Sequence, residues 1–186
     1  MVDWIFVLKS LYFFLPAYFA NMTPTFAKRY KLLESLAKPI DAGKIFRGIP
    51  IFGAHKTWRG VILGTLVGIL IAFLQRLLFK FNFFENISFL NYQEINVFFL
   101  GFLIAFGALM GDMISSFFKR RQNIEPGKSW IPLDQISFVI GAFIFVYPFF
   151  REIPLLAWIL NLILTFFLHI IVNRIGFWLK ISASKI

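Results

Sequence analysis

The sequence predicts an all-α polytopic membrane protein with about five transmembrane helices. Of its 186 residues, 59% are hydrophobic and 20% aromatic, and the mean hydropathy is +0.77. Five apolar segments lie near the ~20 residues that a spanning helix needs, the fourth being the shortest: 4–26, 61–79, 95–118, 136–150 and 153–172. Because the bilayer core cannot hydrate backbone groups, and these runs lack the alternation of a lipid-facing strand, they are expected to be helices.

The first segment follows Met-Val-Asp without a basic n-region or a convincing cleavage site, so it is predicted to be a retained span rather than a signal peptide. The outer connections are too short for a separate soluble domain. Residues 1–186 are therefore expected to form a single integral-membrane domain.

Glycines recur every fourth residue in the second and third segments, at Gly60, Gly64 and Gly68, and at Gly107 and Gly111. Such faces let helix backbones approach closely. The two segments are expected to pack against each other or against a second copy, so a homodimer is one option. Because the segments run in opposite directions, packing against each other would join the start of the second to the end of the third.

The formal charge of +10 is explained by topology rather than by a nucleic-acid partner. Fifteen of the 19 lysines and arginines fall in loop 27–59, in the loop after the third segment, or near the C-terminal end. The positive-inside rule then places the N-terminus outside and the C-terminus in the cytoplasm. A multi-pass protein of the cell membrane is expected, with its polar loops on the cytoplasmic side.

The third segment carries a carboxylate well before its cations. On a helix, Lys119 lies roughly 10 Å beyond Asp112, and Ser116 and Arg120 share the same stripe. If Lys119 marks the head-group level, Asp112 lies inside the cytoplasmic leaflet, where an ionisable side chain is costly and usually faces a polar cavity or a partner. The alternative is an interfacial carboxylate paired with a neighbouring cation.

Asp134 opens the fourth segment on the same side and at a similar depth. Two carboxylates at the ends of antiparallel neighbours can share a divalent ion, and magnesium fits because it binds through one or two carboxylates plus substrate phosphates. Asp112 and Asp134 are therefore the predicted ligands of Mg²⁺. By itself, Asp134 could instead cap the start of a helix.

Lys56, Thr57 and Arg59 stand where the second segment begins. Free backbone N–H groups, the positive helix end and two cations converge there, which favours an anion site. The alternative is ordinary basic flanking with snorkelling side chains. Asn21, at the end of the first segment, could bind a polar substrate group or hydrogen-bond a neighbouring helix.

Two carboxylates, at least five cations and several hydroxyls at one leaflet describe a site where a metal-bound polyphosphate meets a lipid-embedded group. Phosphoryl or nucleotidyl transfer needs mainly positioning, a metal ion and cations. The residues alone predict this reaction class, and they name neither the base nor the lipid.

A signature in this region resembles that of the phosphatidate cytidylyltransferases, which make CDP-diacylglycerol: Ser116 to Arg120, then Lys128, Pro132 and Asp134. The stretches LPAYFANMTP, PIDAGKIFRG, FGAHKTWRG and PLDQISFVIGA are similar to the CDP-archaeol synthase branch, and together cover residues 15–142. The resemblance implies a magnesium-dependent enzyme that transfers CMP from CTP to a lipid phosphate, usually digeranylgeranyl glycerol phosphate, giving CDP-archaeol and pyrophosphate for phospholipid biosynthesis.

Carried over by position, the resemblance implies that Asp112 and Asp134 are the metal-binding and catalytic carboxylates, with Lys119 beside them in the catalytic set. Asn21 would line the nucleotide pocket. The substrate phosphates would be held by Lys56, Thr57, Arg59, Ser116, Lys119, Arg120 and Lys128. Ser137 stands where the family pattern usually has a second acid, which weakens the expectation of a two-metal arrangement.

Three other functions are compatible with parts of the pattern. A diacyl acceptor could replace the isoprenoid ether lipid. A small ion or solute transporter would line a path with its intramembrane charges, although here they crowd one interface instead of the midplane. A structural protein that binds anionic lipid would use the basic loops alone and leave Asp112 and Asp134 without a role.

Overall fold

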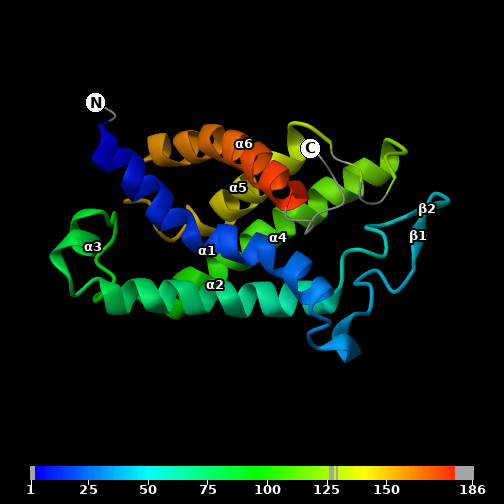
Figure 1. Ribbon diagram of the computed structural model, residues 1–186, viewed down its shortest axis with the longest axis horizontal. Coiled ribbons are helices and arrows are strands. Elements are labelled where there is room, and N and C mark those ends of the chain that lie inside the picture. The colour runs from blue at the N-terminus through cyan, green and yellow to red at the C-terminus, as the bar shows by residue number, and fades with distance from the viewer. Residues whose placement is uncertain (1–2, 126–127, 129, 179–186) are drawn as a thin grey trace.

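Helices make up most of the chain in the computed structural model, which describes residues 3–125, 128 and 130–178. The helices are α1 (Trp4–Arg29), α2 (Trp58–Leu78), α3 (Asn82–Asn86), α4 (Val97–Arg121), α5 (Leu133–Val146) and α6 (Leu155–Trp178). Loop 30–57 adds a 3₁₀ turn, η1 (Glu34–Leu36), and an antiparallel hairpin, β1 (Ile45–Phe46) with β2 (Ile49–Pro50). Figure 1 shows α3 and this hairpin at opposite ends of α2.

All five predicted apolar segments form helices, and the all-α prediction is confirmed apart from the small hairpin. In the described part of the chain, α1, α2 and α4 are long and apolar enough to cross a membrane. The 14 residues of α5 reach only about 21 Å, less than a typical hydrocarbon core of about 30 Å. The molecule is a multi-pass membrane protein. The C-terminal cations Lys180 and Lys185 lie outside the described residues.

Side-chain caps fix where the three long helices begin. Asp3, Thr57 and Asn96 each accept a hydrogen bond, 2.7–3.2 Å long, from the backbone N–H three residues later. Each cap satisfies one of the N–H groups that a helix start leaves without an internal partner. Because Thr57 is the N-cap of α2, Lys56 lies directly before the N-terminus of that helix.

Two prolines inside α1 free backbone carbonyls, and α2 packs against both of these oxygens. Pro16 removes the donor for the carbonyl of Tyr12, which instead accepts a 2.5 Å hydrogen bond from Nε2 of Gln75. Pro24 does the same to the carbonyl of Ala20, and the backbone of Gly64 lies against that oxygen. Neighbouring helices commonly satisfy backbone groups that prolines free in this way.

The predicted glycine faces all pack within one chain, but against different neighbours. A methyl group on Gly68 would collide with Ala105 of α4, so α2 packs on α4 as expected. Gly107 and Gly111 instead face α5, where an added methyl would meet the backbone at Gly141 and Ser137. The expected contact of these two glycines with α2 is therefore wrong. This close backbone contact joins the parts of α4 and α5 that carry Asp112 and Asp134.

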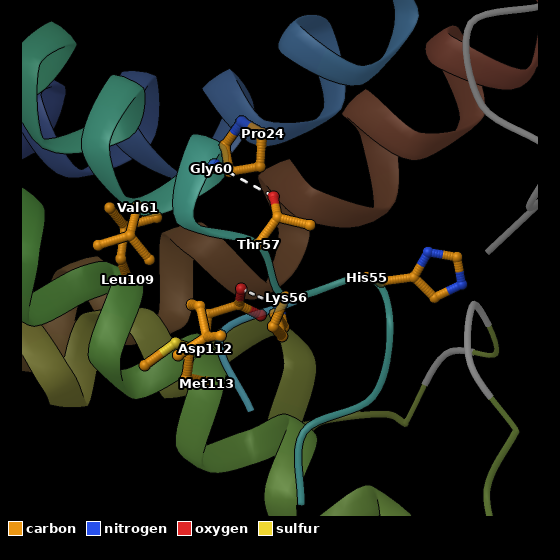
Figure 2. Close-up of a pocket in the computed structure, with 10 residues that line it drawn as sticks. Pro24, His55, Lys56, Thr57, Gly60, Val61, Leu109, Asp112 and Met113 are labelled. Atoms are coloured by element: carbon orange, nitrogen blue, oxygen red, sulfur yellow. Dashed lines mark hydrogen bonds and ion pairs between the residues drawn. The ribbon is translucent and has the colours of Figure 1, made fainter. Parts of the chain in front are cut away.

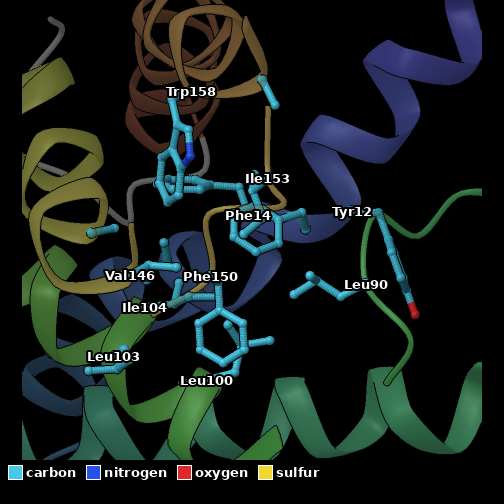
Figure 3. Packing of buried hydrophobic residues seen from close by; sticks show 14 of the residues in the cluster. Tyr12, Phe14, Leu90, Leu100, Leu103, Ile104, Val146, Phe150, Ile153 and Trp158 are labelled. Carbon is cyan, nitrogen blue, oxygen red and sulfur yellow. The ribbon is translucent and has the colours of Figure 1, made fainter. Parts of the chain in front are cut away.

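An aromatic core on the α3 side of the bundle fixes α1 against α5 and α6 (Figure 3). The ring of Phe14 lies edge-on to Trp158 with centroids 5.9 Å apart, and 6.0 Å from Phe138. Burying these rings supplies the packing contacts that hold α5, too short to span alone, inside the bundle.

Candidate active site

Lys56 and Asp112 form an ion pair where the start of α2 meets the end of α4. They line a small pocket of about 40 Å³ together with Pro24, Thr57 and Met113. Figure 2 shows the two charged side chains pointing at each other, while His55 points away. The side chains of Lys56 and Asp112 are 21% and 28% exposed. The predicted meeting of these helix ends is confirmed.

A second ion pair joins Lys119 to Asp134 across α4 and α5, with Nζ 2.6 Å from Oδ2. Asp134 also accepts hydrogen bonds from the backbone N–H of Trp130 at 2.8 Å and from Oγ of Ser115 at 3.2 Å. Lys119 donates to the carbonyl of Lys128 at 2.6 Å. These side chains are more buried than the first pair, at 10% for Lys119 and 18% for Asp134.

Sequence reasoning missed Ser115. It favoured Ser116, which shares a stripe with Asp112, but Oγ of Ser116 donates to the backbone carbonyl of Asp112 at 3.1 Å. Ser115 lies one position earlier and turns toward α5, where it reaches Asp134. The signal would have been the packing face of Gly107 and Gly111, because position 115 continues that four-residue spacing.

The loop that carries Lys56 is held by backbone pairing and by one carboxylate. The N–H of Ile40 donates to the carbonyl of Lys56 at 2.9 Å. The carboxylate of Asp41 accepts N–H bonds of 3.0–3.1 Å from Gly43, Phe52 and Gly53. The loop is thereby folded back on itself before it reaches α2.

Arg121 ties the same loop to the end of α4. Its guanidinium lies 3.9 Å from the ring centroid of Phe117 and donates to the carbonyls of Pro50 at 2.8 Å and Ile51 at 3.1 Å. Because Arg121 is rigidly placed by these contacts, α4 and the loop form one unit around both ion pairs.

A larger pocket of about 490 Å³ lies between this loop and the end of α4. Arg120, Asp41, Gly43, Gly53 and Asn123 are among the residues that line it. Arg120 is only 7% exposed, and its Nε has no hydrogen-bond partner among the described residues. The volume falls in the ~300–1,000 Å³ range usual for small-molecule sites. The pocket can therefore hold an anionic ligand of nucleotide size.

Two groups in this loop have shifted pKa values. Burial by itself would raise the pKa of Asp41, but the three backbone N–H donors outweigh it and hold that pKa below its ordinary value. The pKa of His55 is lowered, first by partial burial and then by the cations Lys28, Arg120 and Lys56. Three cations therefore act on His55, which lines the smaller pocket, and their positive potential favours an anionic ligand there.

The remaining predicted residues lie around these pairs in different roles. Arg59 is 7% exposed and its Nη1 donates to the carbonyl of Leu32 at 3.2 Å, so in this state it holds the preceding loop. Lys128 pairs with Glu125 at 3.0 Å, with both side chains largely exposed. Asn21, predicted to line the nucleotide pocket, is half-buried about two turns before the end of α1. It is not among the residues that line either pocket.

The sequence is similar to known proteins over most of its length. The CarS-like family model, described as CDP-archaeol synthase, matches residues 1–185. A CDP-archaeol synthase of Pyrococcus furiosus is 38% identical over 176 residues, covering 94% of this chain and 95% of the relative. One from Methanococcus aeolicus is 36% identical over 177 residues, covering 95% and 94%. One from Thermococcus kodakarensis is 41% identical over 140 residues, covering 75% and 73%.

A solved structure shares the fold as well. It is described as an intramembrane enzyme for the biosynthesis of archaeal membrane lipids, and it superposes with a TM-score of 0.61 at 26% sequence identity. The match covers 90% of this chain and 94% of that one. With a family model over nearly its whole length and relatives of matching length, this chain belongs to the CDP-archaeol synthase family.

Proposed function

We propose that this protein is a membrane cytidylyltransferase that transfers CMP from CTP to a lipid phosphate, giving CDP-archaeol and pyrophosphate. One observation carries the proposal beyond family membership. Two lysine–carboxylate pairs, Lys56 with Asp112 and Lys119 with Asp134, stand at the joined ends of α2, α4 and α5, beside a nucleotide-sized pocket that contains a buried arginine.

The chemistry asks the protein to hold and neutralise phosphates. A phosphate oxygen of the lipid attacks the α-phosphorus of CTP, and the bond to the leaving pyrophosphate breaks. Lys56, Lys119 and Arg120 supply the cations for the transferring and leaving groups. Before substrate binds, each carboxylate holds its lysine side chain in place, and the triphosphate then competes with the carboxylates for both ammonium groups.

Mg²⁺ is the cofactor we propose, held by Asp112 and Asp134. Their oxygens suit a hard cation that keeps several water or phosphate ligands. Among the described residues no three acidic, histidine or cysteine side chains gather, so substrate phosphates would complete the coordination. When bound, the ion would stabilise charge on the phosphates of CTP.

The acceptor is proposed from the relatives, and the location from the position of the ion pairs on the helices. We propose digeranylgeranyl glycerol phosphate as the acceptor, by likeness to the relatives. The protein would lie in the cell membrane with both ion pairs at the cytoplasmic face, where CTP is available. The pairs lie at the ends of apolar helices, so a lipid head group can reach them from the inner leaflet.

Purified protein with labelled CTP and Mg²⁺ tests the proposal, with archaeal-type lipid phosphate and phosphatidic acid offered in parallel. Label is expected in the archaeal-type lipid, and it should vanish with EDTA or with Asp112→Asn. Glu34→Gln, which changes an exposed acid in η1 away from both pockets, is the matched control and should retain activity.

Label in phosphatidic acid alone would reassign the acceptor to a diacyl lipid. No label in any lipid, from folded protein, would overturn the proposed activity. Ion or solute flux in liposomes without CTP turnover would then support a transporter.

A further inference from the structure

Two glutamines are almost completely buried in the bundle, and they differ in one respect. Gln75 is 2% exposed, and its Nε2 donates to the Tyr12 carbonyl that Pro16 frees, while its Oε1 has no partner among the described residues. Gln135 is 1% exposed, yet neither its Nε2 nor its Oε1 has a partner among the described residues. A buried amide without partners costs free energy, and native proteins rarely keep one unless something binds it.

Gln135 lies at the reaction site. It follows Asp134 directly, in the first turn of α5. One turn further along the same face, the ring of Phe138 lies 6.0 Å from Tyr18 of α1. Gln135 therefore stands on the side of α5 that faces α1, whereas the nucleotide-sized pocket lies beyond Arg120, between the end of α4 and the hairpin loop.

This position selects the substrate that Gln135 can meet. The triphosphate has a pocket lined by Arg120 on the loop side. The acceptor comes from the bilayer and must bring its phosphate to the helix ends from among α1, α4 and α5. A carboxamide offers two N–H donors without a charge, so it can orient a phosphate without drawing electron density from the attacking oxygen as an ammonium group would.

We propose that Gln135 is a further substrate-binding residue, whose side-chain amide donates to the phosphate of the lipid acceptor. This inference rests on the proposed function and assigns one role within it. It explains why a buried amide keeps both polar atoms free in the substrate-free protein.

The test compares Gln135→Met with Gln75→Met, because each swaps a buried glutamine for an apolar side chain of similar shape. Gln135→Met should unfold in detergent at the same or a higher temperature, since it removes polar atoms that had no partner. Its KM for the lipid phosphate should rise about tenfold, the loss of one hydrogen bond to a charged group, while its KM for CTP stays within about twofold.

Gln75→Met should show the opposite pattern. It leaves the Tyr12 carbonyl without its donor, so the melting temperature should fall while neither KM changes selectively. Gln135→Glu is the second variant, and it should lose acceptor binding more strongly because it replaces the donors with a negative charge.

A binding measurement removes the dependence on turnover. Lipid phosphate without nucleotide should raise the melting temperature of the wild type more than that of Gln135→Met. Equal stabilisation by lipid phosphate, or a melting temperature that falls as it does for Gln75→Met, would overturn the inference and make Gln135 structural. A raised KM for CTP alone would reassign it to the nucleotide. Failure of the proposed function would differ, because the wild type itself would transfer no CMP.

Discussion

Replacing Asp134 with asparagine should destabilise the protein more than the same change at Asp112. The carboxylate of Asp134 accepts from Lys119 at 2.6 Å, from the Trp130 backbone at 2.8 Å and from Ser115 at 3.2 Å. Asp112 is more exposed, and Lys56 is the only donor to its side chain among the described residues. Asparagine keeps the shape of both side chains and removes the negative charge.

The expected magnitude follows from burial. Breaking a fully buried ion pair by removing one partner costs roughly 3–5 kcal/mol, because the other charge stays buried alone. The cost of Asp134→Asn should be smaller, about 2–3 kcal/mol, for two reasons. The side chains of Lys119 and Asp134 are still 10% and 18% exposed, and the asparagine oxygen can still accept one hydrogen bond. The Lys56–Asp112 pair, with side chains 21% and 28% exposed, is more accessible to water and should contribute about 1 kcal/mol or less.

Denaturant unfolding in a mild detergent, without nucleotide, measures both changes. Lys119→Gln combined with Asp134→Asn is the matched control, because it removes the stranded ammonium group as well. The double variant should be more stable than Asp134→Asn alone. CMP transfer should be lost in both Asp112→Asn and Asp134→Asn, although the two variants differ in stability. Loss of activity can therefore be distinguished from loss of stability.

Equal destabilisation by Asp112→Asn and Asp134→Asn would refute the dependence on burial. A double variant that loses the full sum of its two single changes would show that Lys119 and Asp134 are not coupled.

Three further predictions follow from the packing and the loop. Gly111→Ala should destabilise by about 1–3 kcal/mol, because its methyl would collide with the Ser137 carbonyl; denaturant unfolding with the lipid-facing Ile114→Ala as control measures it, and an unchanged midpoint would contradict the packing. CTP affinity should rise more steeply from pH 7.5 to 5.5 in the wild type than in His55→Gln. Bound CTP would raise the lowered pKa of His55, so that His55 takes up a proton on binding. Equal slopes of CTP affinity against pH for the two proteins, measured by calorimetry, would disprove this. Asp41→Asn should lose about 1–2 kcal/mol at neutral pH. Because the pKa of Asp41 is lowered in the folded protein, its contribution to stability is present above the ordinary pKa and disappears as the pH falls through the folded-state pKa. The stabilities of variant and wild type should therefore converge in acid. A stability difference that persists in acid would refute this role of Asp41.

Most of the architecture was predictable from local sequence. Apolar runs and capping residues such as Asp3, Thr57 and Asn96 depend on only a few neighbouring residues. Helix positions and their alternating direction can therefore be predicted without knowing which helices are in contact. The length of α5 was already marked by the shortest apolar run. The meeting of the α2 start with the α4 end was expected from the glycine spacing, although of those glycines it is Gly64 and Gly68 that contact α4.

The sequence by itself determined the helices, the reaction class and the set of charged residues at one end of the bundle. Only the tertiary structure decided which partner each one takes. Asp112 of α4 meets Lys56 at the start of α2, whereas Lys119 turns to Asp134 of α5. Ser115 and Gln135 gain their roles the same way. The pairing of these side chains depends on which side of α4 packs on α5. Close backbone contact at Gly107 and Gly111 sets that side. The spacing of residues along one helix does not reveal which neighbouring helix they contact.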